Sequence, residues 1–208
     1  MGLTSLFLEM KDKHVLIIGT GSVGIRRARR FLDVGANVSI ITHNIDDNLK
    51  EEFLSKGATF YEDNDRGELL DKCDLVVVAT DDKKLNEEIS IKARDKLVNC
   101  ASDISLSNVI VPSTFDIGGV TVSLYTGSKS PLMAKELRKK IQSVITPEDI
   151  LNIRLQESIR DLLKDNINSQ QDRKKCMIKI KNDKQVQKYI SNGNLEEAIE
   201  YVKENFIF

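Results

Sequence analysis

The chain has 208 residues, enough for one domain of ordinary size and a smaller second one. Its 31 basic and 32 acidic residues nearly cancel, so the whole molecule creates no long-range field toward nucleic acid or membrane surfaces. No segment approaches the apolar length of a membrane span. We therefore expect no nucleic-acid or membrane partner, and any anionic ligand must be held by local groups.

The N-terminus and the cysteines are typical of a cytoplasmic protein. Residues 1–8 carry no basic stretch and no apolar run long enough for export. Cys73, Cys100 and Cys176 are scattered, and no two of them share the spacing of metal ligands. The sequence therefore predicts reduced thiols and no metal site.

An apolar run at residues 15–18 ends in three glycines, Gly19, Gly21 and Gly24, and a helix is predicted over 25–34. In this G-x-G-x-x-G spacing the first glycine allows a tight turn, the second lets a diphosphate approach the backbone, and the third lets the helix pack closely on the sheet. The diphosphate meets free N–H groups at the helix start. The alternative is that the glycines only pack the turn. We favour a dinucleotide site because the turn lies between two predicted strands.

Strands and helices alternate through the first half of the chain. Strands are predicted over residues 15–18, 37–42, 58–61, 75–79 and 97–101, and helices over 25–34, 46–55, 66–72 and 83–94. The strand at 75–79 is apolar on both faces, as expected for a strand covered by helices on each side. This alternation predicts an α/β fold with a Rossmann-like parallel sheet.

Polar residues follow two of these strands where each strand ends. Thr80 and Asp81 follow the fourth strand, and Asp103 follows the fifth. Open α/β sheets bind ligands at the carboxyl ends of their strands, so both segments are expected at one crevice. Asp81 or Asp82 would alternatively cap the next helix, and Asp103 the next turn.

The alternation ends near residue 109. A hairpin over 109–115 and 120–125 turns at Gly118 and Gly119. Helices are predicted from Pro131 to about 145, from Pro147 to about 164, from about Asp183, and after Asn194, with a polar linker over 166–172. Thr146 and Asp149 form a predicted capping box. We expect a Rossmann domain over 1–113, a small α+β dimerisation and substrate-binding region over 114–145, and a helical C-terminal domain over 146–208.

Several motifs occur together in a fixed order. They are residues 7–13, the glycine turn with Arg26, Arg27 and Ala28, Ala79-Thr80-Asp81-Asp82 with 85–86, 98–99 with Asp103, 111–113, and 126–134. Together they resemble the precorrin-2 dehydrogenase family of siroheme biosynthesis, over roughly residues 5–145. The ordered set is far more specific than the glycines alone.

The resemblance implies oxidation of precorrin-2 to sirohydrochlorin with NAD⁺ as hydride acceptor, followed in some members by insertion of ferrous iron. It ties Asp103 to the chemistry, places Thr126 or Ser128 near the tetrapyrrole, and gives His43 and Asn44 contacts with the cofactor. The expected cofactor-binding residues are Gly19, Gly21, Ser22, Val23, Gly24, His43, Asn44, Thr80 and Asp81. The second strand offers neither an acid for the ribose nor an arginine for a 2′-phosphate, so the choice of NAD follows from the resemblance.

The chemistry of this reaction gives a physical role to the same residues. Oxidation sends a hydride to the nicotinamide and a proton to a base, and Asp103 is the expected general base. The substrate carries many carboxylates, so Lys129 and the helix start at Ser130 are expected to attract them, with hydroxyl donors from Thr126, Ser128 and Ser130. The alternative is that this loop only caps its helix.

The resemblance also implies a homodimer formed through residues 109–145, whose alternating Val120, Val122 and Leu124 suit an interface or an internal core. Without a methyltransferase segment the chain is expected to receive its substrate from another enzyme. Iron insertion is left open. Two other hypotheses are an NAD-sensing regulatory module without catalysis and a dehydrogenase for a small metabolite.

Overall fold

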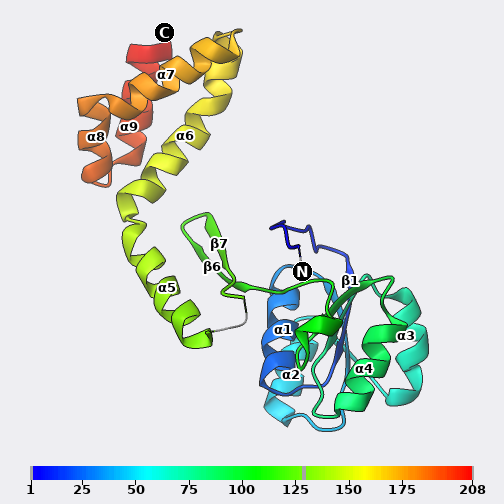
Figure 1. Cartoon of the computed structure of the whole chain (residues 1–208). Coiled ribbons are helices and arrows are strands. Elements are labelled where there is room, and N and C mark those ends of the chain that lie inside the picture. The colour runs from blue at the N-terminus through cyan, green and yellow to red at the C-terminus, as the bar shows by residue number, and fades with distance from the viewer. Residues whose placement is uncertain (1, 128–129, 208) are drawn as a thin grey trace. The chain divides into compact units, whose positions relative to one another are not determined.

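The first half of the chain forms a five-stranded parallel sheet in the order β3-β2-β1-β4-β5 (Figure 1). The strands are β1 (His14–Ile18), β2 (Asn37–Ile41), β3 (Thr59–Tyr61), β4 (Leu75–Val78) and β5 (Leu97–Cys100). The helices between them are α1 (Ser22–Asp33), α2 (Asp47–Ser55), α3 (Arg66–Lys72) and α4 (Lys83–Lys92). The computed structural model describes residues 2–127 and 130–207. The predicted Rossmann-like sheet is confirmed, strand by strand.

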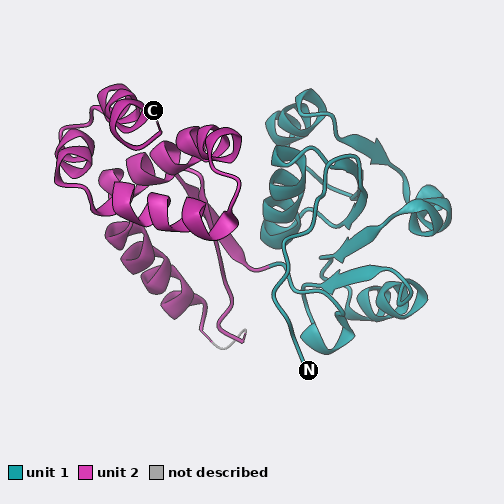
Figure 2. Ribbon diagram, turned by 90° about the horizontal axis from the view of Figure 1, so that it is seen from above, with its two compact units in different colours: residues 1–111 teal, residues 112–208 magenta. Residues whose placement is uncertain are grey.

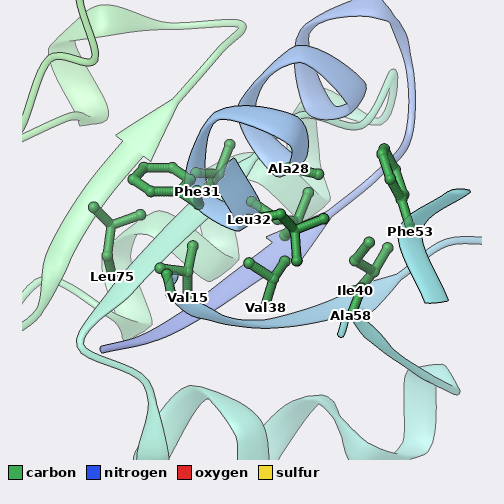
Figure 3. Packing of buried hydrophobic residues seen from close by; sticks show 12 residues of the cluster. Val15, Ala28, Phe31, Leu32, Val38, Ile40, Phe53, Ala58 and Leu75 are labelled. Carbon is green, nitrogen blue, oxygen red and sulfur yellow. The ribbon is translucent and has the colours of Figure 1, made fainter. Parts of the chain in front are cut away.

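Alternating side chains of the central strands divide between two hydrophobic cores, one on each face of the sheet. Val15 and Ile17 of β1 pack with Phe31 of α1 and Phe53 of α2, as Figure 3 shows for most of this cluster. On the other face of the sheet, Leu16 and Ile18 of β1 pack with residues of α3 and α4. Because both faces are covered, all of β4 and the last four residues of β1 are apolar and buried, as in other parallel sheets.

The chain divides into two compact units, Met1–Val111 and Pro112–Phe208 (Figure 2). This boundary lies two residues before the expected end of the Rossmann domain at 113. The second unit contains the antiparallel hairpin β6 (Ser113–Ile117) and β7 (Val120–Leu124), followed by α5 (Pro131–Val144), α6 (Pro147–Asn166), α7 (Gln170–Asn182), α8 (Lys184–Ser191) and α9 (Leu195–Val202). The further division at 145 stays a prediction.

The hairpin is shorter than predicted, because no strand forms over residues 109–112. Asn99 donates a hydrogen bond from Nδ2 to the Val109 carbonyl, 3.1 Å, and the Val109 N–H donates to the carbonyl of Val98, 3.2 Å. Val109 and Val111 also pack against the core of the first unit. These contacts hold the segment along the end of β5, and β6 begins only after Pro112, which has no N–H to donate.

Helices α6 to α9 enclose a core of their own. Leu155, Ile159 and Leu163 recur every fourth residue on the buried face of α6 and pack with Ile180, Val186, Ile190, Ala198 and Val202. The predicted polar linker over 166–172 is too long, because the Ser169 hydroxyl accepts a hydrogen bond from the Asp172 N–H and begins α7 at Gln170. Across residues 2–127 and 130–207, no helix is both long enough and apolar enough to cross a membrane.

Candidate dinucleotide site at the carboxyl edge of the sheet

Three strands end level with one another at the carboxyl edge of the sheet. Ile18 of β1 is in register with Val78 of β4, and Val78 with Cys100 of β5. The next residues keep the alignment, since the Ala79 N–H donates to Ile18 and the Ala101 N–H to Val78, both at 2.8 Å. The strand order reverses between β1 and β4, which is where open α/β sheets bind ligands.

Two of the three glycines in the turn after β1 are required by the fold. Gly19 has φ +93°, and a Cβ there would lie 2.5 Å from the carbonyl oxygen of Ala79. A Cβ on Gly24 would lie 2.0 Å from the carbonyl oxygen of Gly19. Both contacts are with backbone atoms, which cannot move aside, so these glycines let β1, β4 and α1 pack closely.

Gly21 is different, because no contact among the described residues requires a glycine there. Its φ is −65°, and an added Cβ would meet only the carbonyl oxygen of Ala79, at an ordinary 3.9 Å. Gly21 is the N-cap of α1 and supplies no side-chain cap, and the first turn contains no acidic residue. The Ile25 N–H donates a hydrogen bond to the Gly21 carbonyl at the start of α1. The N–H groups of Ser22 and Val23 come before Ile25 in the first turn and have no partner within the helix. The turn therefore suits a diphosphate, which needs close approach and free donors.

The loop after β2 is tied to the glycine turn by a small hydroxyl network. The hydroxyls of Thr20 and Thr42 lie 2.6 Å apart, and the Thr20 hydroxyl donates to the carbonyl of Asn44 at 2.9 Å. His43 and Asn44 are exposed beside it. The sequence prediction names His43 and Asn44 but misses the threonine pair. The signals for this pair are a threonine between the first two glycines and another directly after β2.

Asn86 of α4 joins the ends of β4 and β5. It is fully buried; its Oδ1 accepts from the Thr80 hydroxyl at 2.6 Å, and its Nδ2 donates to the Thr80 carbonyl at 2.9 Å and to the Ser102 hydroxyl at 3.0 Å. Asp82 is the N-cap of α4, whereas Asp81 is exposed. The predicted Thr80 therefore has its hydroxyl committed to Asn86. The signal that could have identified Asn86 is an amide on the apolar face of α4, between Leu85 and Ile89.

Asp103 lies three residues beyond β5, on the same edge of the sheet. It caps a short 3-10 helix (Ile104–Leu106), and its Oδ1 accepts hydrogen bonds from the Ser105 hydroxyl at 2.7 Å and the Ser105 N–H at 2.8 Å. Within the described part of the chain, Oδ2 receives no hydrogen bond. The Ser105 hydroxyl, and then its N–H, lower the pKa of Asp103 below its ordinary value. Asp103 is therefore an exposed carboxylate with one oxygen anchored and the other available.

The predicted substrate-binding residues belong to the second unit. Ser130 caps α5 by accepting a hydrogen bond from the Met133 N–H, 3.2 Å, and the Thr126 hydroxyl donates to the Ser130 carbonyl, 3.3 Å. Ser128 and Lys129 lie outside the described residues. The cap that the sequence predicts at Ser130 is confirmed, and both hydroxyls shape the start of α5.

Comparison with known proteins gives a match for the first unit and for the chain as a whole. Residues 6–113 match a family model described as putative NAD(P)-binding. A putative precorrin-2 dehydrogenase of Methanocaldococcus jannaschii is 32% identical over 185 residues, which cover 84% of this chain and 88% of that protein.

Other relatives are longer. The siroheme synthase of Tolumonas auensis is 30% identical over 142 residues, which cover 67% of this chain but only 30% of that protein, so the chain spans less than a third of its length. The solved structure of SirC, a precorrin-2 dehydrogenase, aligns with a TM-score of 0.77 at 23% identity, covering 97% of this chain and all of that one, and it has the same fold.

Proposed function

The chain belongs to the precorrin-2 dehydrogenase family, and from that premise we propose that it oxidises precorrin-2 to sirohydrochlorin with NAD⁺ as the hydride acceptor. The observation that carries the proposal is the common edge of β1, β4 and β5. Free N–H donors at the start of α1 and the carboxylate of Asp103 both follow strands that end in register there. One strand separates β1 from β5, so their ends lie about 10 Å apart, a distance that one bound dinucleotide can bridge.

The glycine turn and its neighbours hold the cofactor in this proposal. The N–H groups of Ser22 and Val23 donate to the diphosphate, and the missing side chain at Gly21 allows the close approach. The loop at His43 and Asn44 lies where the adenosine half would extend along β2. NAD⁺, when bound, supplies the hydride acceptor.

Asp103 acts as the general base. Loss of a hydride from the reduced macrocycle must be matched by loss of a proton. Asp103, whose pKa the Ser105 hydrogen bonds lower further, is ionised at neutral pH and can accept that proton. The Ser105 contacts hold Oδ1, so Oδ2 is the atom that accepts the proton. Thr126, Ser128, Lys129 and Ser130 are proposed to hold carboxylates of the tetrapyrrole.

The proposal is tested by mixing the purified chain with enzymatically made precorrin-2 and NAD⁺ and following the absorbance of NADH. Wild type should form NADH, and Asp103→Asn should lower kcat by about 10²- to 10⁴-fold while the Kd for NADH stays within about twofold. Full turnover by Asp103→Asn would refute the base assignment. NADH binding without turnover by wild type would favour the regulatory sensor, and turnover with an unrelated small metabolite would favour the other dehydrogenase hypothesis.

Asp183→Asn is the matched control, because it makes the same change at another capping carboxylate. Asp183 caps α8 by accepting hydrogen bonds from Gln185 at 2.8 Å and Val186 at 3.0 Å, as Asp103 caps its own short helix. The control should lose little stability, because asparagine also caps helices, and should keep its turnover. A matching fall in turnover would mean that Asp103 acts only through folding.

The assembly and the location of the enzyme are also proposals. Leu132 and Val144 of α5 are 69% and 70% exposed. These exposed apolar side chains support a homodimer formed through residues 114–145. Sedimentation equilibrium should give a mass of two chains for wild type. The double variant Leu132→Asp with Val144→Asp should have the mass of one chain. Cys73, Cys100 and Cys176 are free thiols, which suits the cytoplasm.

A further inference from the structure

Arg27 of α1 carries a charge for which the described residues provide no partner. It is half-buried, and its buried Nε atom has no hydrogen-bond acceptor among the residues that the structure describes. Arg29, two residues along the same helix, shows the usual arrangement, with Nε and Nη2 bound to both carboxylate oxygens of Glu52 at 2.8 and 2.7 Å. Helix α1 therefore contains one arginine, Arg29, with a complete ion pair and another, Arg27, with no counter-charge among the described residues.

The surroundings of Arg27 oppose its charge instead of compensating it. Burial lowers the pKa of Arg27 to about 10, and the positive charge of Arg26 acts in the same direction. The guanidinium still keeps its charge at neutral pH. A partly desolvated cation without a partner is costly, and proteins keep such a group mainly where a bound anion completes it.

The position of Arg27 in α1 puts the glycine turn within its reach. It lies five residues after Ser22, about 7.5 Å along the helix axis from the start of α1. Side chains on a helix tilt toward its N-terminus and cover the preceding turn, and an extended arginine is about long enough to cover that distance. The guanidinium is therefore within reach of the end of the helix where the free N–H donors lie.

We propose that Arg27 is an oxyanion-binding residue of the site, which holds either a phosphate of the cofactor or a carboxylate of the tetrapyrrole. The planar guanidinium binds both groups in the same two-pronged manner, so the residue by itself serves either source. The carboxylate alternative rests on the proposed function, whereas the phosphate alternative rests only on the NAD(P)-binding domain. In both cases the ligand supplies the counter-charge that Arg27 lacks among the described residues.

Two titrations of the full chain distinguish the sources without turnover. NADH, followed by its fluorescence, reports the phosphate, and uroporphyrin I, a stable octacarboxylate porphyrin, reports the carboxylates. Arg27→Gln should weaken one of them by about 10- to 100-fold, since a hydrogen-bonded charge is lost. Loss of NADH affinity identifies the phosphate, and loss of uroporphyrin affinity identifies the carboxylate. If both affinities stay within twofold of wild type, the proposal is wrong.

Arg26→Gln is the matched control, because Arg26 is the exposed neighbour on the same helix and the change removes the same charge. It should alter both affinities by less than about twofold. The melting temperature gives a further readout: Arg27→Gln should leave it unchanged or raise it, because an uncompensated charge is removed. A structural arginine would lower it. If Arg27→Gln does not fold, Arg27→Met, which keeps the apolar stem, replaces it in the same two titrations with the same expected losses.

The proposed substrate is tested by NADH formation from precorrin-2, whereas the role of Arg27 is tested by the two titrations. The two proposals therefore fail in different measurements.

Discussion

Helices α1 and α6 begin in opposite ways. At α6, Thr146 and Asp149 form a capping box in which the Thr146 hydroxyl accepts from the Asp149 N–H at 3.1 Å and the Asp149 carboxylate accepts from the Thr146 N–H at 2.9 Å. At α1, Gly21 provides no cap and no acid follows it in the first turn. The start of α6 thus satisfies donors with its own side chains, whereas the start of α1 leaves donors free where a ligand is expected.

This difference separates residues that stabilise from residues that bind. A capped helix start contributes to folding and offers nothing to a ligand, whereas an uncapped start is less stable alone and gains from an anion. The same contrast holds inside the glycine turn, where Gly19 and Gly24 are required by close backbone packing and Gly21 is not. Variants at these positions should therefore change stability or binding, but seldom both.

The largest effect is expected from Gly24→Ala. Its Cβ would lie 2.0 Å from the Gly19 carbonyl oxygen, so the variant should lose about 3 kcal/mol or more of unfolding free energy, measured in urea. Gly67→Ala in α3 is the matched control, because nothing lies within 4 Å of the added Cβ. It should gain about 0.4–1 kcal/mol. A Gly24→Ala protein as stable as wild type would contradict the packing of the turn.

Gly21→Asp should leave the fold intact and remove the cofactor. The new side chain has room, but its negative charge would lie where the diphosphate binds, so the Kd for NADH should rise by about 100-fold. Gly2→Asp makes the same change at an open position and should leave the Kd unchanged. Unaltered NADH binding by Gly21→Asp would remove the turn from the site.

Thr146→Ala should affect only stability. Loss of the hydroxyl from the capping box of α6 should lower the unfolding free energy by about 1 kcal/mol, with no change in the Kd for NADH. Asn194→Ala is the control, since Asn194 occupies the N-cap of α9 without a side-chain cap hydrogen bond. A smaller loss is expected there. Equal losses in the two variants would show that the capping box of α6 contributes little.

Ser105→Ala should produce the smallest change, a shift in pH dependence. The Ser105 hydroxyl is the largest cause of the lowered pKa of Asp103, so its removal raises that pKa toward the ordinary value. The base must be ionised, and the acid limb of kcat/KM should therefore move to higher pH. The lowered pKa of Asp103 also stabilises the fold at pH values above the pKa of Asp103 in the unfolded chain. This contribution is lost as the pH falls through the pKa of Asp103 in the folded protein. Ser143→Ala, on α5, should leave the pH profile unchanged. An unmoved acid limb in Ser105→Ala would exclude Asp103 as the titrating base.

Much of the fold follows from local patterns in the sequence. The apolar strands, the glycine spacing and the caps at Asp82, Ser130 and Thr146 act over a few residues, so their predicted positions agree with the structure within a few residues. The predicted linker before α7 is too long because one serine in a polar tract begins a helix. Errors of this kind arise where several capping residues follow one another.

The carboxyl edge of the sheet shows the limit of such patterns. The sequence identifies Thr80 and Asp103 as candidate residues of this edge, but the environment of such residues depends on segments far away in the chain. Asn86 reaches Ser102 across 16 residues, and Thr20 reaches Thr42 across 22. The apolar residues 109–112 are expected to begin the first strand of the hairpin, yet contacts with β5 keep them out of it.

The sequence by itself determined that this chain folds as a parallel α/β sheet with a dinucleotide turn and an ordered set of family motifs, because each of these depends on neighbouring residues and on spacing. The tertiary structure decided which glycine leaves room for a ligand, which hydroxyls are committed to Asn86, and which arginine lacks a partner. These properties depend on what lies opposite each side chain, and that is set only when distant segments pack together.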